Sequence, residues 1–295
     1  MAGPIIAGRA GTRAMATVTG GVRRTGDLAQ RMGDLAQWPV FVHRILLYSA
    51  RDLLWRRKYA KTVARHVSDI VVGAGATVVG GGMIFVIFTM AFFVGTEVGL
   101  QGYTGLESIG AESFMGLVGS FANVREITPV IAATALAAQC GSAFTAELGA
   151  MRISEEIDAL EVMGIPSFAY LVCTRVVAAL IALVPLYLIA LFASFFSTRL
   201  ISTQFFDLAP GVYDYYFRLY LPTIDLVYSS IKVAVFAFAV ISIHCFYGYY
   251  ATGGPAGVGR AAGRAIRLSI IVIVALNLLL SYVFWGGGAT VRLTG

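Results

Sequence analysis

The chain has 295 residues, of which 58% are hydrophobic and only 13% are charged, and its mean hydropathy is +0.79. Soluble domains carry about 25% charged residues, so this composition excludes a soluble globule and a disordered chain and predicts an all-α integral membrane protein. The net charge of +6 arises in residues 1–66, which hold 12 Lys and Arg against 3 Asp and Glu. A basic segment on so hydrophobic a chain favours anionic lipid headgroups over nucleic acid.

The first 66 residues divide into two segments. Residues 1–33 are rich in Gly, Ala, Thr and Arg and lack the apolar core of a secretory signal peptide, so we predict a flexible basic arm. Residues 34–66 have apolar side chains at helical spacing with arginines around them, and Trp38 and Trp55 lie near the ends. This pattern predicts an amphipathic helix in the membrane interface, with a helix packed on other protein as the alternative. Residues 67–295 form the predicted membrane domain.

Five long segments of the membrane domain carry no charge. A helix crosses the hydrocarbon core in about 20 residues, and each segment has at least that length. The uncharged segments are residues 70–96, 127–146, 176–198, 233–259 and 268–291. The spans predicted around them are residues 70–96, 113–146, 167–198, 226–251 and 268–291. Lys and Arg are concentrated before the first span and before the last one. The positive-inside rule therefore predicts a multi-pass protein of the inner (plasma) membrane with a cytoplasmic N-terminus and an outside C-terminus.

Two further features concern contacts within the membrane and at its outer surface. Gly73, Gly80 and Gly81 fall at the start of the predicted first span, and small residues let helices approach closely in lipid, so we name them as weak candidates for a dimer contact. The outer segment 205–220 is rich in Phe and Tyr. It predicts an aromatic belt at the interface, or alternatively a docking surface for an outer partner.

Residues for catalysis are not arranged in any familiar pattern. None of the three lysines follows Gly in a phosphate-binding loop, so the chain is not expected to hydrolyse ATP. The three histidines and three cysteines show neither metal-ligand nor disulfide spacing, and His244 within the fourth span is assigned no role. We therefore predict a non-catalytic chain without a metal or cofactor of its own.

The connection between the second and third spans has the features of a short helix. Ser154 is placed to cap its N-terminus, and Gly164 followed by Pro166 is a stop signal. The predicted helix covers residues 154–164 and lies on the cytoplasmic side.

This connection is acidic on one side and apolar on the other. Ile153, Ile157 and Leu160 share a helical face. A short helix at the membrane surface has the right size to seat in a groove of another protein, and a simple linking turn is the alternative. The residues predicted to contact such a partner are Glu147, Met151, Glu155, Glu156, Asp158 and Glu161.

Arg125 and Glu126 interrupt the second span. Ionisable side chains at membrane depth are costly and usually face a partner or an aqueous cavity. We predict that this pair lies on a substrate pathway, and a purely structural ion pair remains the alternative.

These segments resemble the MlaE/YrbE permease family, the membrane subunits of lipid-moving ABC transporters that work with MCE proteins. Residues 125–130, Arg-Glu-Ile-Thr-Pro-Val, are similar to the family's Arg-Glu-Leu-Gly-Pro-Val. Residues 146–166, which contain Ala-Glu-Leu-Gly, Glu-Glu-Ile-Asp-Ala-Leu and Met-Gly-Ile-Pro, resemble its signature. One stretch departs from the pattern: many relatives carry Gly-Arg where residues 139–143 read Gln-Cys-Gly-Ser-Ala, so a substrate role is not transferred to that position. The basic arm is similar to the actinobacterial, mycobacterial-type branch, and the chain looks more like its B type than its A type.

The resemblance implies a fold and a set of partners. The expected fold has an interfacial N-terminal helix, five spans and a cytoplasmic coupling helix. The expected partners are a second, different YrbE-type permease chain, an ABC ATPase dimer that binds ATP and Mg²⁺, an MCE hexamer on the outer side, and membrane lipid, but no nucleic acid. Import of fatty or mycolic acids is the implied transport, with sterols as the second choice. A passive scaffold for MCE proteins and a membrane-embedded lipid enzyme are the rival functions.

Overall fold

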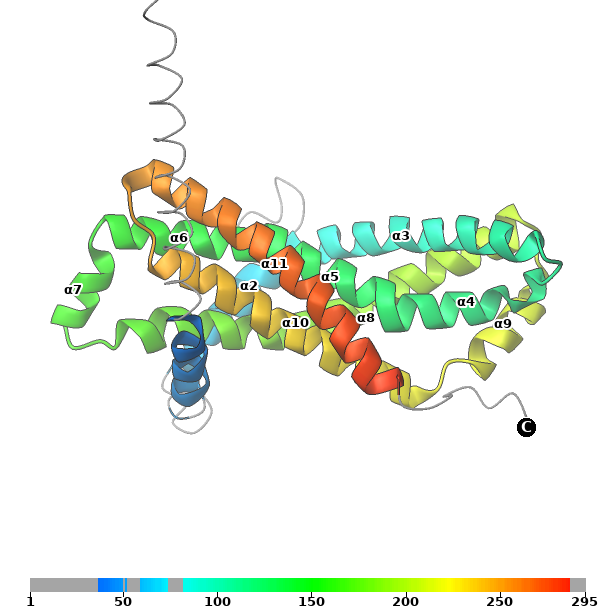
Figure 1. The fold of residues 1–295 in the computed structure, drawn as a ribbon, viewed down its shortest axis with the longest axis horizontal. Coiled ribbons are helices and arrows are strands. Elements are labelled where there is room, and N and C mark those ends of the chain that lie inside the picture. The colour runs from blue at the N-terminus through cyan, green and yellow to red at the C-terminus, as the bar shows by residue number, and fades with distance from the viewer. Residues whose placement is uncertain (1–36, 50, 52–58, 74–81, 287–295) are drawn as a thin grey trace, which may run out of the picture. The chain divides into compact units, whose positions relative to one another are not determined.

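The computed structural model describes residues 37–49, 51, 59–73 and 82–286, and these are almost entirely helical (Figure 1). The chain divides into two compact units, residues 1–47 and 48–295. The described residues of the first unit, 37–47, are helical, and the predicted arm at 1–33 lies outside the described residues. The second unit contains α2 (Ala60–Val71), α3 (Gly82–Glu107), α4 (Met115–Phe121), α5 (Thr128–Leu136), α6 (Ser142–Ile153), α7 (Glu156–Val162), α8 (Thr174–Leu200), α9 (Pro210–Leu219), α10 (Thr223–Tyr249) and α11 (Gly254–Trp285).

Five helical segments of the described chain are long and apolar enough to cross a membrane. They are Gly82–Glu107, Glu112–Ile153, Ala169–Phe205, Thr223–Tyr249 and Gly254–Trp285. The second segment joins α4, α5 and α6 through two π-helical turns, and the third joins a π-helical turn to α8. The prediction of an all-α protein with five spans is thereby confirmed.

The first span begins later than the predicted residue 70. The helix α2 ends at Val71, and α3 starts at Gly82, whose φ of +52° belongs to the left-handed region. A β-carbon on Gly82 would lie 2.4 Å from the carbonyl oxygen of Val72, so only glycine fits at this position. The uncharged run 70–96 thus joins the end of α2 to the first half of α3, and Glu97 lies within the span instead of ending it.

The later start of the first span changes the position of the glycines that were predicted to form a dimer contact. Gly73 has a φ of +78° and follows α2, so it does not belong to a spanning helix. Gly80 and Gly81 lie outside the described residues. The prediction that Gly73 lies within a span is therefore wrong.

The predicted amphipathic helix at 34–66 is not one continuous helix. The residue before α2, Tyr59, has φ −118° and ψ 28°, so α2 begins as a new helix. The helix α2 packs against α8, and its apolar side chains Val63 and Ile70 are buried. Part of the predicted interfacial segment is therefore a helix packed on the spans.

The most extensive contact between described spans is that of α3 with α8, and α10 lies against α6, α8 and α11 (Figure 1). Gly95 permits the contact between α3 and α8, because a β-carbon there would lie 2.2 Å from Ser197 Oγ and 2.5 Å from the Ser194 carbonyl oxygen. The Thr198 hydroxyl donates to the Gly95 carbonyl at 2.8 Å. Small residues and hydrogen bonds of this kind hold helices together in lipid, where burial of apolar surface gives little gain.

We expect Gly95→Val to destabilise the protein by about 1–3 kcal/mol, because the new side chain must push the α8 backbone away. Reversible denaturation in detergent would measure the change in the free energy of unfolding. Gly105→Val is the matched control in the same helix, since nothing lies within 4 Å of its position. Equal stability of the two variants would contradict the close packing.

Candidate functional site

The predicted polar pair Arg125–Glu126 lies in a π-helical turn of the second span, Ala122–Ile127. The residue Pro129 follows in α5 and has no N–H. It can donate neither to the carbonyl of Arg125, four residues earlier, nor to that of Val124, five residues earlier. The turn is therefore short of one backbone donor, which another part of the membrane domain can supply.

Two side chains of α10 (Thr223–Tyr249) donate to these carbonyl groups. The Ser229 hydroxyl donates to the Val124 carbonyl at 2.6 Å, and Tyr187 of α8 is hydrogen-bonded to Ser229. The Lys232 ammonium donates to the Arg125 carbonyl at 2.5 Å. The π-helical turn is thereby attached to α10 and, through Tyr187, to α8. Single π-helical turns within α-helices are frequent at functional sites.

The Arg125 side chain forms an ion pair with Asp225 at the start of α10. Its Nε donates to Asp225 Oδ2 at 2.8 Å, and its Nη2 lies 2.7 Å from the same oxygen. Trp285 Nε1 donates to Asp225 Oδ1 at 2.9 Å, and the Phe121 ring centre lies 4.0 Å from the guanidinium carbon. The Asp225 side chain is 1% exposed, so its charge depends on these partners for compensation.

Glu126 is held by side chains of α10 and α11. Ser281 donates to Glu126 Oε1 and Asn277 donates to Oε2, both at 2.6 Å. Lys232 Nζ lies 3.5 Å from Oε2 and also donates to Ser281 Oγ at 2.7 Å. One buried ammonium group therefore connects the second, fourth and fifth spans.

We refer to Arg125, Glu126, Asp225 and Lys232 as the charged cluster. Its two cations and two anions balance formally, as expected for groups held inside a membrane protein. Glu126 is the most exposed member at 46%, against 15% for Arg125 and 0% for Lys232. A molecule outside the chain can therefore reach the Glu126 carboxylate most easily.

A second π-helical turn, Ala137–Gly141, occupies the stretch that departs from the family pattern. A β-carbon on Gly141 would lie 2.6 Å from the His244 ring, so glycine is required for α10 to approach. His244 Nδ1 lies 2.8 Å from the Thr145 hydroxyl, and both side chains are fully buried. This geometry describes close packing of two spans. No group of three or more His, Cys, Asp or Glu within the described part of the chain could hold a metal ion.

The predicted coupling helix 154–164 corresponds to the shorter α7, and its N-terminus differs from the prediction. The prediction that Ser154 caps this helix is wrong, because Ser154 ends α6. Its N–H and hydroxyl both donate to the Ala150 carbonyl, at 3.0 and 2.9 Å. Glu155 instead precedes α7, with a left-handed φ of 59° and no capping hydrogen bond.

The C-terminus of α7 agrees with the predicted stop signal. Gly164 has a φ of +74°, its N–H donates to the Glu161 carbonyl at 2.9 Å, and that of Ile165 donates to the Leu160 carbonyl at 3.0 Å. These two bonds form a Schellman motif.

The acids of α7 are exposed, whereas its central apolar residue is not. The four exposed acids are Glu155, Glu156, Asp158 and Glu161. Ile157 is fully buried, so it packs against the protein instead of offering itself to a groove. Val162 and Met163 are exposed by 89% and 65% and form the apolar part of the free surface.

Glu147 and Met151 lie on α6, apart from α7. Glu147 accepts from Arg175 Nη2 at 3.0 Å, and Arg175 also donates to the Leu171 carbonyl at 2.8 Å. Burial, and then the nearby Arg175, lower the pKa of His66 on α2. The predicted contact residues thus separate into an α7 surface and an ion pair that joins α6 to α8.

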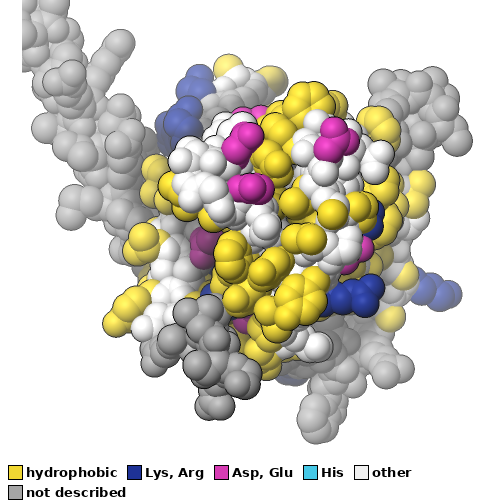
Figure 2. Space-filling model, turned by 90° about the vertical axis from the view of Figure 1, so that its right-hand side faces the viewer, with side chains coloured by type: hydrophobic (Ala, Val, Ile, Leu, Met, Phe, Trp, Pro, Cys, Tyr) yellow, Lys and Arg dark blue, Asp and Glu magenta, His cyan; other side chains and the backbone are white. Residues whose placement is uncertain are grey.

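The α9 end of the second unit carries a small aromatic core built from Tyr103, Met115 and Tyr213. Tyr103 stacks on Phe206 with ring centres 4.1 Å apart. Figure 2 shows this end with many hydrophobic side chains on its surface and acidic side chains gathered towards its upper edge. The aromatic residues of 205–220 therefore serve in part as a core, while Phe205 and Tyr215 remain 67% and 62% exposed.

A family model described as Permease MlaE matches residues 72–283 of the chain. The matched region contains all four members of the charged cluster, and α7 as well.

The chain belongs to the MlaE permease family.

Curated relatives agree with this membership. A "Probable ABC transporter permease protein" of Rickettsia bellii is 34% identical over 200 residues, which cover 68% of this chain and 77% of the relative. The chloroplastic protein TRIGALACTOSYLDIACYLGLYCEROL 1 of Arabidopsis thaliana is 33% identical over 68% of this chain and 57% of its own length. The "Intermembrane phospholipid transport system permease protein MlaE" of Haemophilus influenzae is 27% identical over 72% of this chain and 81% of its own.

In this MlaE-family chain, the sequence predicted two of the four members of the charged cluster. Asp225 and Lys232 were missed, although they lie seven residues apart and therefore on one face of α10. The supporting Asn277 and Ser281 were missed as well, although they are four residues apart on α11. Asn277 and Ser281 lie within the uncharged run 268–291, where a search for polar side chains at helical spacing would have found them. Asp225 and Lys232 lie just before the uncharged run that begins at residue 233.

Proposed function

We propose that the chain is the permease subunit of an ATP-driven lipid transporter, and that the charged cluster borders the lipid pathway. The observation that carries this proposal is the half-exposed Glu126, fixed by Ser281, Asn277 and Lys232 between three spans. A carboxylate within a span has a high cost, and its retention at an accessible position favours a functional role over a purely structural one. The relative of Haemophilus influenzae is named for phospholipid transport, which supports a lipid substrate.

The remaining parts of the transporter come from other chains. One chain offers one α7, whereas an ATPase dimer offers two equivalent surfaces, so a second permease chain completes the pair. Following the family resemblance, we propose that this second chain is a different homologue, and that an MCE hexamer takes or delivers lipid on the outer side during import. Native mass spectrometry of the purified complex would show two copies of this chain if the heterodimer proposal is wrong.

We place the N-terminus in the cytoplasm and the C-terminus outside. The 12 Lys and Arg of residues 1–66, and the arginines Arg260, Arg264 and Arg267 before the last span, support this orientation. Single cysteines at positions 20 and 293 of a cysteine-free chain would be labelled by an impermeant thiol reagent from opposite sides. Labelling of both from one side would overturn it.

We expect Glu126→Gln to reduce lipid transport about tenfold or more. The glutamine keeps the size of the side chain and one acceptor oxygen. It loses the negative charge that Lys232, Ser281 and Asn277 compensate. A hydrogen bond to a charged group contributes about 1.5–3 kcal/mol. ATP-dependent lipid transfer between the reconstituted complex and an acceptor vesicle, at matched protein levels, is the measurement.

Asp69→Asn is the control, because Asp69 is an exposed carboxylate on α2, outside the candidate spans. Its transport should remain that of the wild type. Normal transport by a normally assembled Glu126→Gln complex would remove Glu126 from the pathway. Absence of ATP-dependent transfer in the wild-type complex would favour the scaffold function instead.

A further inference from the structure

A chain of hydrogen bonds joins α7 to the end of α10. The Ser167 hydroxyl donates to Glu161 Oε1 at 2.6 Å, and Ser167 Oγ lies 2.9 Å from the Tyr249 hydroxyl. An ionised carboxylate only accepts, and a serine hydroxyl has a single hydrogen, so the Tyr249 hydroxyl donates to Ser167. The bonds therefore run from Tyr249, the last residue of α10, through Ser167 to Glu161 of α7.

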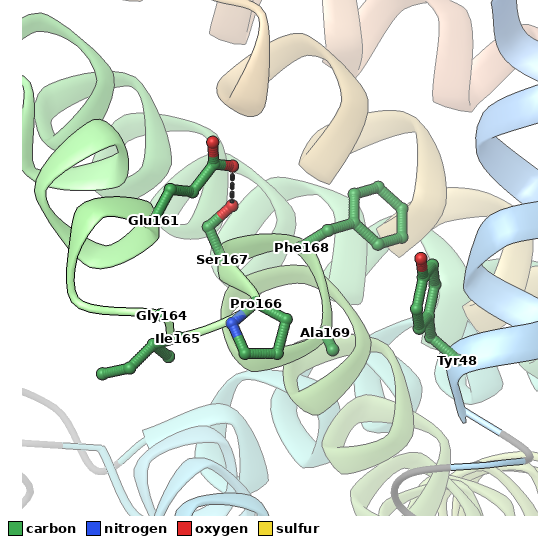
Figure 3. A pocket seen from close by; sticks show the side chains of 8 residues that line it. All are labelled: Tyr48, Glu161, Gly164, Ile165, Pro166, Ser167, Phe168 and Ala169. Carbon is green, nitrogen blue, oxygen red and sulfur yellow. Dashed lines mark hydrogen bonds between the residues drawn. The ribbon is translucent and has the colours of Figure 1, made fainter.

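The connection between α7 and Ser167 is loosely packed. A pocket of about 370 Å³ lies beside it, lined by residues 164–169 together with Glu161 and Tyr48 (Figure 3). Nothing lies within 4 Å of a β-carbon placed on Gly164. Glu161 is exposed whereas Ser167 is buried, and Figure 3 shows the hydrogen bond between them across this connection. The bond therefore fixes the end of α7 to the membrane domain where packing does not.

The same end of α10 is also held by α6. A β-carbon on Gly248 would lie 3.0 Å from the Thr145 Cα and 2.9 Å from the Leu148 Cβ, so glycine lets the two helices approach closely. The helix α6 directly precedes α7 and is its most extensive packing partner among the described elements. Both elements that carry the α7 surface are thus attached to one end of α10.

The other half of α10 belongs to the charged cluster, since it carries Asp225 and Lys232. The helix is continuous over 27 residues and contains no proline. At a rise of 1.5 Å per residue, about 25 Å separate Lys232 from Tyr249. Rigid helices and hydrogen-bond networks carry coupling between distant sites. A displacement of α7 can therefore reach Arg125 and Glu126 through one continuous element.

We propose that Ser167 and Tyr249 are positioning residues for transport, which link the position of α7 to the charged cluster through α10. This inference rests on the proposed function, because it takes α7 as the contact for the ATPase. Ser167 is buried and Tyr249 is half-buried, so neither is placed to form that contact itself. Breaking the link should leave the ATPase bound but separate nucleotide binding from changes at the charged cluster.

Trp285 provides a spectroscopic report on the charged cluster, because its indole N–H donates to Asp225. The chain has three tryptophans, so labelling it with fluorotryptophan gives few fluorine NMR signals, and Trp285→Phe identifies that of Trp285. The labelled chain in its complex with unlabelled ATPase is measured without nucleotide and with a non-hydrolysable ATP analogue. The analogue should shift the wild-type Trp285 signal. Ser167→Ala and Tyr249→Phe should each reduce this shift, with ATPase copurifying at the wild-type level.

Two further variants make the test specific. Ser167→Ala combined with Tyr249→Phe interrupts the same chain of bonds, so it should behave like either single variant. Ser108→Ala is the control, because the Ser108 hydroxyl donates to the Gly105 carbonyl within its own segment, and it should keep the full shift. Lipid transferred per ATP hydrolysed should fall about two- to tenfold in each single variant, the effect of one neutral hydrogen bond.

Three results would overturn the link. They are a wild-type Trp285 signal that does not respond to the analogue, a shift that is undiminished in both single variants, and loss of ATPase from either of them, which would assign the bonds to docking. Failure of the proposed function would appear separately, as absence of ATP-dependent lipid transfer by the wild-type complex. The fluorine signal does not require transfer, so it would still decide whether α7 and the charged cluster are linked.

Discussion

Asp225→Ala is expected to lower the free energy of unfolding by about 3–5 kcal/mol, because it leaves the Arg125 guanidinium in the membrane domain without its counter-ion. The Trp285 indole N–H loses its acceptor in the same variant. Reversible denaturation of the purified chain in detergent would measure the change. This loss of stability should exceed the loss caused by removing one partner of an exposed ion pair.

Asp214→Ala is the control with the same charge change. Asp214 accepts two hydrogen bonds from Arg199, and these bonds lower the pKa of Asp214, yet the two side chains are 39% and 46% exposed. Their contribution to stability is present at neutral pH and is lost as the pH falls through the lowered pKa, and it should stay below about 1 kcal/mol.

A double variant separates loss of the pair from loss of packing. Arg125→Met combined with Asp225→Ala removes both charges, so it should be more stable than Asp225→Ala alone despite carrying one more substitution. Additive losses in the double variant would show that Arg125 and Asp225 do not compensate each other.

The sequence predicts the number of spans well and their limits poorly, and the first span shows why. Hydropathy depends on composition, so the uncharged run 70–96 appears as one unit. The positive φ values at Gly73 and Gly82 divide that run between two helices. Glu97 then lies inside the span, where a hydrogen bond to Gln101 of the same helix lowers the cost of its polar group.

The charged cluster was only half predictable for a related reason. Arg125 and Glu126 are adjacent and interrupt an apolar run, which makes them visible in the sequence. Their partners lie about 100 to 155 residues away along the chain, on α10 and α11. Only the folded arrangement shows that Lys232 replaces the N–H that Pro129 lacks, because a missing donor does not indicate which side chain will supply one.

The coupling segment illustrates the limit of local rules. Ser154 before two glutamates satisfies the rule for a helix N-cap, but the preceding helix α6 extends to Ile153 and takes Ser154 into its last turn. The left-handed residue falls at Glu155 instead, and α7 is left with seven residues. The acids nevertheless remain exposed, so the predicted charge of this surface does not depend on the cap.

Reversing Glu155, Glu156 and Asp158 to Lys together is expected to release the partner ATPase and to abolish transport, if α7 is the coupling helix that we propose. Single substitutions to Ala should have little effect, since each exposed charge contributes about 0–1 kcal/mol. Three reversals change the local charge by six, which turns attraction to a basic partner surface into repulsion. The measurement is the amount of ATPase that copurifies per permease, at low and high salt, because salt screens exposed charges.

The folded permease should tolerate this change, which makes the result interpretable. Asp158 loses only an exposed ion pair with Arg152, and the buried Ile157 is left untouched. A matched triple reversal at Glu107, Glu112 and Asp207, near the α9 end, carries the same charge change far along the chain from α7 and should retain the ATPase. Undiminished ATPase in the α7 variant at both salt concentrations would show that the segment only links two spans, and the contact would then have to be sought at the exposed Val162 and Met163.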